Sequence, residues 1–225
     1  MNNKFDIIVI GAGHAGIEAA SVAARLGANT ALITTSLATI CKPSCNPNIG
    51  GTAKGHLVKE IDALGGAMGF LADIAGIQFK MLNKSKGAAI WSPRAQIDKD
   101  LYPIVALDYL KTVKNLTLIE DTVNEILVNS SNSAIGCKTY KNEKLYSKAI
   151  ILCAGTFLNG KIFIGQDFYS GGRKGEPAVE NISEMLESLG VKKGRLKTGT
   201  PPRIDKNSID YKEINYYYEQ DTIHN

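Results

Sequence analysis

The sequence predicts an α/β fold built around a parallel sheet, and three observations lead to that prediction. The apolar run at residues 7–10 is β-branched throughout, which is typical of a strand buried on both faces. It ends directly in a glycine-rich turn, and the Ala-rich residues 17–26 that follow favour a helix. A second fully apolar run, residues 149–153, is again followed by a glycine turn. We therefore expect a strand–turn–helix unit at the start of the chain and a return to the same sheet later.

The first turn has the spacing G-x-G-x-x-G that dinucleotide-binding proteins place between a strand and a helix. Gly11 allows the tight turn, Gly13 lets the backbone approach a pyrophosphate, and Gly16 lets the helix pack close to the strand. The helix N-terminus adds free N–H groups and a partial positive charge. We expect a dinucleotide to bind at Gly11, Ala12, Gly13, His14, Ala15 and Gly16.

The segments that follow favour FAD over NAD as the dinucleotide. A second strand is expected at residues 28–35, but Thr34, Thr35 and Ser36 occupy the place of the acidic residue that binds the NAD ribose. Strand-like runs at 116–128, 134–140 and 144–153, with polar turns between them, predict an antiparallel meander. In FAD enzymes with two dinucleotide domains, such a meander leads the chain back to the FAD-binding sheet.

The predicted fold is therefore a Rossmann-like FAD-binding domain of the glutathione-reductase type, with a parallel sheet plus a β-meander. We assign it to residues 1–167. Residues 168–225 are expected to be a connecting segment and the truncated start of a second, inserted domain, because the polar, Tyr-rich end has no closing element.

Composition indicates a cytoplasmic globular protein. The 225 residues are 44% hydrophobic and carry a formal net charge of +4, which permits contact with a polyanion without requiring it. No apolar stretch approaches the ~20 residues of a membrane span, and no signal peptide is visible before the first strand. The four scattered cysteines do not suggest a disulfide scaffold, so a reducing compartment is expected.

The long loop at residues 37–55 contains two of the cysteines, Cys41 and Cys45. Their spacing is not C-x-x-C, and no zinc-like cluster follows, so no metal site is expected. Lys54 and His56 are close to Cys45 in sequence and would lower its thiol pKa, making it a nucleophile. The alternative is that Cys45 is a small buried hydrophobe, and the residues alone favour neither interpretation over the other. For Cys137 and Cys153, which lie in strand-like runs, the buried role is favoured.

Residues 73–99 interleave basic side chains with Phe79 and Trp91. Such a pattern can hold nucleic acid through phosphate contacts and stacking. The residues alone favour the simpler interpretation, a solvated basic face around core aromatics.

Several longer blocks together resemble the MnmG (GidA) family of FAD-dependent tRNA uridine 5-carboxymethylaminomethyl modification enzymes, and they cover nearly the whole chain. The blocks are GAGHAG at 11–16, SCNPNIGG at 44–51, KGHLVKEIDALGG at 54–66, AGIQFKMLNKSKG at 75–87, RAQIDKDLY at 94–102, GTFLNGKIFIG at 155–165, YSGGR at 169–173 and GRLKTGTPPRID at 194–205. Family members are much longer, so the chain resembles their N-terminal third.

The resemblance implies a set of roles for this chain. FAD would bind at the glycine turn, with further contacts at Val123 and at Val179, where many relatives have Ser. Cys45, in the string SCNP, matches the family's N-terminal catalytic cysteine; a second cysteine and much of the NADH region would lie beyond residue 225. NADH reduces the flavin, and methylenetetrahydrofolate supplies a methylene group to C5 of the wobble uridine in tRNA. The family's partner is the GTPase MnmE, and its members form homodimers.

A tRNA substrate also makes basic side chains candidates for phosphate contacts. These are Lys80, Lys84, Lys86, Arg94, Arg173, Lys174, Arg195, Lys197 and Arg203. Two alternatives remain open. The chain could be a flavin-dependent disulfide oxidoreductase that uses Cys41 and Cys45 as its redox pair, although the related reductases have four residues between their cysteines. It could also be a non-catalytic FAD-binding module.

Overall fold

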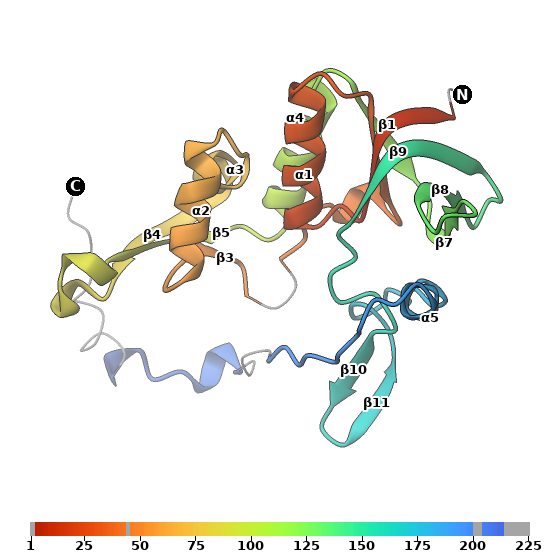
Figure 1. Cartoon of the computed structure of the whole chain (residues 1–225). Helices are drawn as coiled ribbons and strands as arrows, with labels where there is room; N and C mark the ends of the chain where they lie inside the picture. The colour runs from red at the N-terminus through yellow and green to blue at the C-terminus, as the bar shows by residue number, and fades with distance from the viewer. Residues whose placement is uncertain (1–2, 44–45, 200–203, 214–225) are drawn as a thin grey trace. The chain divides into compact units, whose positions relative to one another are not determined.

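The computed structural model describes residues 3–43, 46–199 and 204–213, and the chain forms two compact units (Figure 1). The first contains the residues up to Lys42 together with Ala106–Leu196. The second contains Pro43–Val105 and the described residues after Leu196. The domain boundary predicted between residues 167 and 168 remains a prediction.

The first unit is built on a six-stranded sheet with the order β6-β2-β1-β9-β8-β7. Its first four strands are parallel, and the last three form an antiparallel meander. This arrangement confirms the predicted Rossmann-like fold. The strands are β1 (Lys4–Ile10), β2 (Thr30–Thr34), β6 (Leu116–Glu120), β7 (Val123–Val128), β8 (Ala134–Thr139) and β9 (Lys144–Leu152).

Strand β9 belongs to both parts of this sheet. Tyr146 pairs with Gly136 of β8 in the antiparallel meander, while Ile150 pairs with Ile8 in the parallel sheet. In Figure 1, β9 runs beside β1 along this pairing. The apolar run at 149–153 therefore returns the chain to the central strand, as predicted, and brings the second glycine turn beside the first.

The single strand expected at 116–128 is in fact two strands. The carboxylate of Asp121 accepts a hydrogen bond from the Thr122 N–H at 2.7 Å, and the Asp121 N–H donates to the Thr34 carbonyl at 2.9 Å. A side chain that bonds its own neighbouring backbone favours a turn over continued pairing. The chain therefore changes direction at Asp121 and Thr122, so that β7 begins the meander.

Helix α1 (His14–Arg25) packs on this sheet through small side chains. Ala20, Ser21 and Ala24 are fully buried, and the helix contacts β1 and β2. The other helices of the unit are the 3-10 turn η1 (Leu37–Thr39) and α5 (Ile182–Ser188); α4 (Leu101–Thr112) crosses the unit boundary. One apolar cluster runs under the sheet and includes Phe5, Ile8, Ile33 and Ile182.

A two-stranded hairpin, β10 (Lys161–Ile164) and β11 (Asp167–Ser170), also belongs to the first unit. The rings of Phe163 and Phe168 lie 5.7 Å apart, and both are more than 60% exposed. The sequence reading missed this hairpin. Its apolar side chains are solvent-exposed, so the apolar-in, polar-out alternation of a half-buried strand is absent.

The second unit contains a small antiparallel sheet with the order β3-β5-β4. Ile49, Ala95 and Ile97 share one face of it and are buried, and the strands contact α2 and α3. The elements are β3 (Asn48–Gly50), α2 (Lys54–Ala63), α3 (Met68–Ala75), β4 (Gly76–Leu82), η2 (Lys84–Lys86), η3 (Ala88–Ile90), β5 (Ser92–Ile97) and η4 (Lys206–Ser208).

The aromatic side chains in the basic segment are not core residues. Phe79 is 51% exposed and Trp91 is 45% exposed, so the interpretation of a basic face around core aromatics is wrong on this point. The Trp91 indole N–H donates to the Lys84 carbonyl at 3.2 Å and so holds the basic turn η2. Among the described residues, no helix is both long and apolar enough to cross a membrane.

Candidate cofactor site at the glycine turn

The glycine turn joins β1 to α1, and two of its glycines are required by close backbone packing. Gly11 has a φ of +98°, and a Cβ atom there would come within 2.5 Å of the Cys153 carbonyl oxygen. A Cβ atom at Gly16 would come within 1.7 Å of the Gly11 carbonyl oxygen. Neither position accepts a side chain, so these two residues set the shape of the turn and the approach of α1.

Gly13 differs because its missing side chain leaves open space. A Cβ atom placed there meets no atom within 4 Å, and the backbone has ordinary extended angles, φ −74° and ψ −176°. Gly13 is the N-cap of α1, it is exposed, and the first turn of the helix carries no acidic residue. An open backbone surface at a helix N-terminus without a competing carboxylate fits the pyrophosphate of a dinucleotide.

Ala12 connects this turn to the segment that follows β2. Its carbonyl accepts a hydrogen bond from the Cys41 N–H at 2.9 Å, just after η1. Ala12 is buried, whereas Ala15 is exposed and His14 is half-buried at the first position of α1. The predicted cofactor-binding residues are thus brought together in one turn, and that turn also holds the start of the Cys41–Lys42 segment.

A carboxylate lies at the end of β2 although the local sequence has none. Thr34 pairs with Glu120 at the end of the parallel strand β6, and the Glu120 carboxylate accepts from the Leu37 N–H at 2.8 Å. Sequence reasoning missed Glu120 because it looked for an acidic residue on β2 itself. The available signal was the parallel pairing of two strands whose carboxyl ends meet at one edge of the sheet.

Val123 and Val179, the further predicted cofactor contacts, both point to the apolar core. Val123 is 3% exposed, and Val179 packs against the same cluster. The Val179 N–H donates to the Phe157 carbonyl at 2.8 Å, and its carbonyl accepts from the Asn159 N–H at 3.0 Å. A side-chain contact with a cofactor is therefore disfavoured at both, and a backbone contact at Val179 would use the second lone pair of its carbonyl.

The three described cysteines are shielded from solvent: Cys41 and Cys137 are buried, and Cys153 is half-buried. Cys41 is 2% exposed with a φ of +51°, and burial, aided by the Glu18 carboxylate, raises the pKa of its thiol. Burial, with a smaller contribution from Asp121, raises the pKa of Cys137 to about 12. Burial also raises the pKa of Cys153. These thiols resist ionisation. Cys45 lies outside the described residues.

Lys54 is one of the two basic residues that are close to Cys45 in sequence, and its ammonium group is bonded to a backbone carbonyl. Its Nζ donates to the Asn48 carbonyl at 2.7 Å, and burial lowers the pKa of the side chain. No group of His, Cys, Asp and Glu side chains suited to a metal ion occurs in the described part of the chain.

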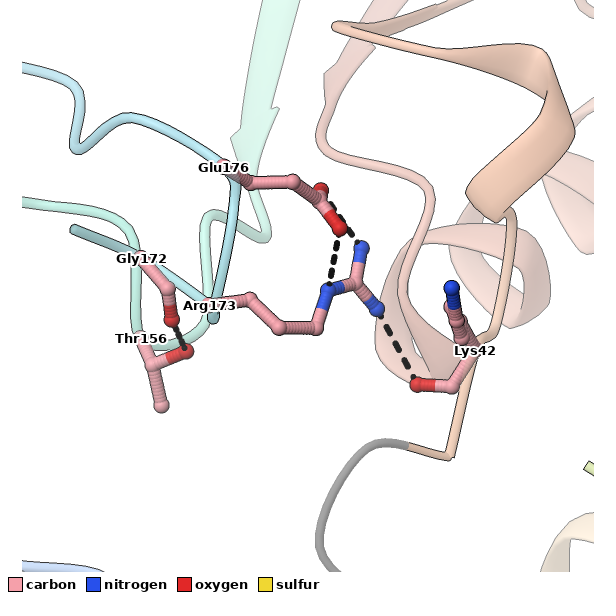
Figure 2. Close-up of polar contacts among 5 residues, drawn as sticks. All are labelled: Lys42, Thr156, Gly172, Arg173 and Glu176. Atoms are coloured by element: carbon pink, nitrogen blue, oxygen red, sulfur yellow. Dashed lines mark hydrogen bonds and ion pairs between the residues drawn. The ribbon is translucent and has the colours of Figure 1, made fainter. Parts of the chain in front are cut away.

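Arg173 makes the densest set of polar contacts near the second glycine turn, and Figure 2 shows them. Its Nε and one terminal nitrogen pair with the two carboxylate oxygens of Glu176, each at 2.8 Å. The other terminal nitrogen donates to the Lys42 carbonyl at 3.1 Å. The guanidinium lies 5.5 Å from the centre of the Phe157 ring, and the Thr156 hydroxyl donates to the Gly172 carbonyl at 2.8 Å.

The other basic side chains predicted as tRNA contacts are differently placed. Arg195 donates to the Asn159 carbonyl at 3.3 Å, and Lys80 and Arg94 are half-buried on β4 and β5. The exposed members of the set are Lys84, Lys86, Lys174, Arg195 and Lys197. Arg203 lies outside the described residues.

The fold and the site together define the class of the protein: an α/β protein of the Rossmann type, with a glycine turn of the dinucleotide-binding kind and a meander beside it. The chain belongs to the family described as glucose inhibited division protein A (GidA), whose sequence model matches residues 6–224. The family resemblance predicted from the motifs is confirmed.

Named relatives support the same assignment. The tRNA uridine 5-carboxymethylaminomethyl modification enzyme MnmG of Thermodesulfovibrio yellowstonii is 54% identical over 92% of this chain. The Bacteroides fragilis protein of the same name is 48% identical over 94%. The chain spans about a third of the length of these curated relatives, 33% and 34% respectively.

Solved structures agree with the fold. GidA of Aquifex aeolicus superimposes with a TM-score of 0.87 at 47% identity, covering 94% of this chain and 35% of that one. A GidA-related protein of Thermus thermophilus gives a TM-score of 0.59 at 22% identity, covering 83% of this chain and 68% of that one, and supports the fold alone.

Proposed function

We propose that this chain is the FAD-binding part of a flavoenzyme that modifies C5 of the wobble uridine in tRNA, installing a carboxymethylaminomethyl or aminomethyl group. The observation that carries the proposal is the open backbone at Gly13, in a turn whose other two glycines are fixed by packing. Membership of the GidA family and relatives named for this tRNA modification indicate the substrate.

We assign separate residues of the chain to cofactor binding and to catalysis. The turn Gly11–Gly16 would hold the FAD pyrophosphate through its N–H groups, and the carboxylate of Glu120, which pairs with Thr34 at the end of β2, would accept from a ribose hydroxyl. Bound FAD would supply the redox step, with NADH as reductant and methylenetetrahydrofolate as one-carbon donor. Cys45 would act as the nucleophile toward the uracil ring, a role that requires a thiolate.

The partners of the proposed enzyme follow from the same family. We propose tRNA as substrate, the GTPase MnmE as partner through a region beyond residue 225, a homodimer as the assembled form, and a cytoplasmic location. Among the basic residues predicted from the sequence, the exposed ones are our candidates for phosphate contacts: Lys84, Lys86, Lys174, Arg195 and Lys197.

The alternative of a disulfide oxidoreductase is less well supported. Its redox pair would include Cys41, which is buried and has a raised thiol pKa. An attacking or leaving thiol in disulfide exchange needs access and thiolate character, and burial opposes both. A non-catalytic FAD-binding module would give no modified uridine in the assay below, even as the full-length protein.

The test compares the 225-residue chain with a full-length protein that adds the remaining two-thirds of the relatives' length. Each is mixed with FAD, NADH, methylenetetrahydrofolate, MnmE, GTP and unmodified tRNA, and the wobble nucleoside is analysed by mass spectrometry. We expect the C5-modified uridine from the full-length protein and none from the 225-residue chain. Absence of product from the full-length protein would contradict the proposed function, and turnover by the short chain would contradict the assignment of parts.

A further inference from the structure

The carbonyl of Ala12 and the N–H of Gly13 belong to one peptide unit of the glycine turn. The carbonyl accepts a hydrogen bond from the Cys41 N–H at 2.9 Å. In a trans peptide the N–H is directed to the opposite side of the same plane. The Gly13 N–H makes no hydrogen bond with the residues that the structure describes, and Gly13 is exposed. The bond from Cys41 therefore orients an N–H that is open to a pyrophosphate.

Cys41 donates this hydrogen bond from an unusual backbone conformation. Its φ is +51°, in the left-handed region that a residue with a Cβ atom rarely adopts. Such a conformation persists only where the surrounding structure fixes it. Burial restrains the Cys41 side chain, which is 2% exposed, and the backbone N–H is held by Ala12. The conformation of Cys41 and the orientation of the Ala12–Gly13 peptide are thus coupled through one hydrogen bond.

The next residue, Lys42, is held through both of its backbone groups. Its N–H donates to the Thr39 carbonyl at 3.2 Å, and its carbonyl accepts from the Arg173 guanidinium at 3.1 Å (Figure 2). The guanidinium is itself fixed by the bidentate pair with Glu176. Restraints on the residue that follows Cys41 therefore add to those on Cys41 and keep it in the left-handed conformation.

We propose that Cys41 is a positioning residue for FAD: its left-handed backbone holds the Ala12–Gly13 peptide so that the Gly13 N–H faces the pyrophosphate before the cofactor binds. The thiol takes no part in this role. An N–H that is already oriented in the free protein does not have to be ordered during binding, so the conformation of Cys41 contributes to the affinity for FAD. The inference rests on the proposed function, because it takes FAD as the ligand of the glycine turn.

The test replaces cysteine with valine at two buried positions of the 225-residue chain. Cys41→Val places a β-branched side chain where φ is +51°, a conformation that such residues strongly disfavour. Cys137→Val is the matched control, because Cys137 is also buried but lies in strand β8, where valine is favoured. In a titration of the flavin-free protein with FAD, we expect Kd to rise roughly tenfold or more in Cys41→Val. Kd should stay at the wild-type value in Cys137→Val.

Cys41→Ala distinguishes the role of the backbone from a role of the thiol. Alanine keeps the N–H, has no β-branch and fits the buried site, so we expect this variant to bind FAD like the wild type. Equal loss of affinity in the alanine and valine variants would assign the effect to the thiol and overturn the proposal. Wild-type affinity in Cys41→Val would also overturn it. A wild-type chain that binds no FAD would instead contradict the proposed function.

Amide hydrogen exchange measured by NMR tests the positioning without the cofactor. In the flavin-free chain, we expect the amide of residue 41 to exchange severalfold faster in Cys41→Val than in the wild type or Cys137→Val, because its bond to Ala12 is lost. Arg173→Lys should accelerate the same amide, since lysine keeps the charge but loses the fork that holds Lys42. This second variant leaves residue 41 itself unchanged, so it decides the matter if Cys41→Val does not fold. Wild-type exchange at residue 41 in folded Arg173→Lys, together with wild-type FAD affinity, would contradict our inference.

Discussion

Replacing Gly13 with valine is expected to abolish tight FAD binding without unfolding the protein. The backbone at Gly13 has a φ of −74° and a ψ of −176°, angles that valine adopts readily, and a Cβ atom there meets no protein atom within 4 Å. The side chain would instead occupy the space where a pyrophosphate approaches the backbone. We expect the dissociation constant for FAD to rise on the order of 100-fold, about 2.7 kcal/mol, in a fluorescence titration of the flavin-free protein.

Gly194→Val is the matched control for this substitution. Gly194 is also exposed, its φ lies outside the left-handed region, and a Cβ atom there meets nothing within 4 Å. It should bind FAD like the wild type. If both Gly13→Val and Gly194→Val bind FAD with the affinity of the wild type, the cofactor does not bind at the glycine turn.

Serine substitutions are expected to show that the two cysteines of the loop at residues 37–55 differ in their importance for catalysis. In the full-length protein, Cys45→Ser should reduce formation of the modified uridine on the order of 10³-fold or more, because serine is a far weaker nucleophile at neutral pH. Cys41→Ser should keep substantial activity. The Cys41 thiol is buried, and the contact that it makes with Ala12 uses the backbone N–H, which serine retains.

Melting temperature and flavin content serve as controls for both variants, because a buried hydroxyl at position 41 costs some stability. Equal loss of activity in both variants at normal flavin content, together with dithiol–disulfide cycling, would favour the disulfide oxidoreductase. Mass spectrometry of the wobble nucleoside measures the first outcome, and thiol titration after reduction measures the second.

The parts of the fold that the sequence predicted are those where local pattern and burial agree. The run at residues 7–10 became the central strand β1, and the apolar run at 149–153 marked its neighbour β9. The glycine spacing identified the turn because the three glycines stand in one short segment between a strand and a helix. The clash that excludes a side chain at Gly16 is also local, with the Gly11 carbonyl, whereas the one at Gly11 involves the distant Cys153 carbonyl.

The predictions that were wrong or missing concern features that depend on contacts between segments far apart in sequence. Asp121 breaks the expected long strand by bonding to its neighbour and to Thr34, and no apolar pattern reports that. Glu120 supplies a carboxylate to the end of β2 only because β6 pairs there. The sequence offered Arg173 as a candidate phosphate contact, although Glu176, three residues later, was already available as a local ion-pair partner.

The most direct test of the central claim is the visible spectrum of the purified 225-residue chain after incubation with FAD and removal of free cofactor. The account predicts a protein-bound flavin spectrum with one FAD per chain, lost in Gly13→Val and kept in Gly194→Val. A folded wild-type chain that takes up no flavin from excess FAD would contradict the assignment of this unit as the FAD-binding part of the enzyme.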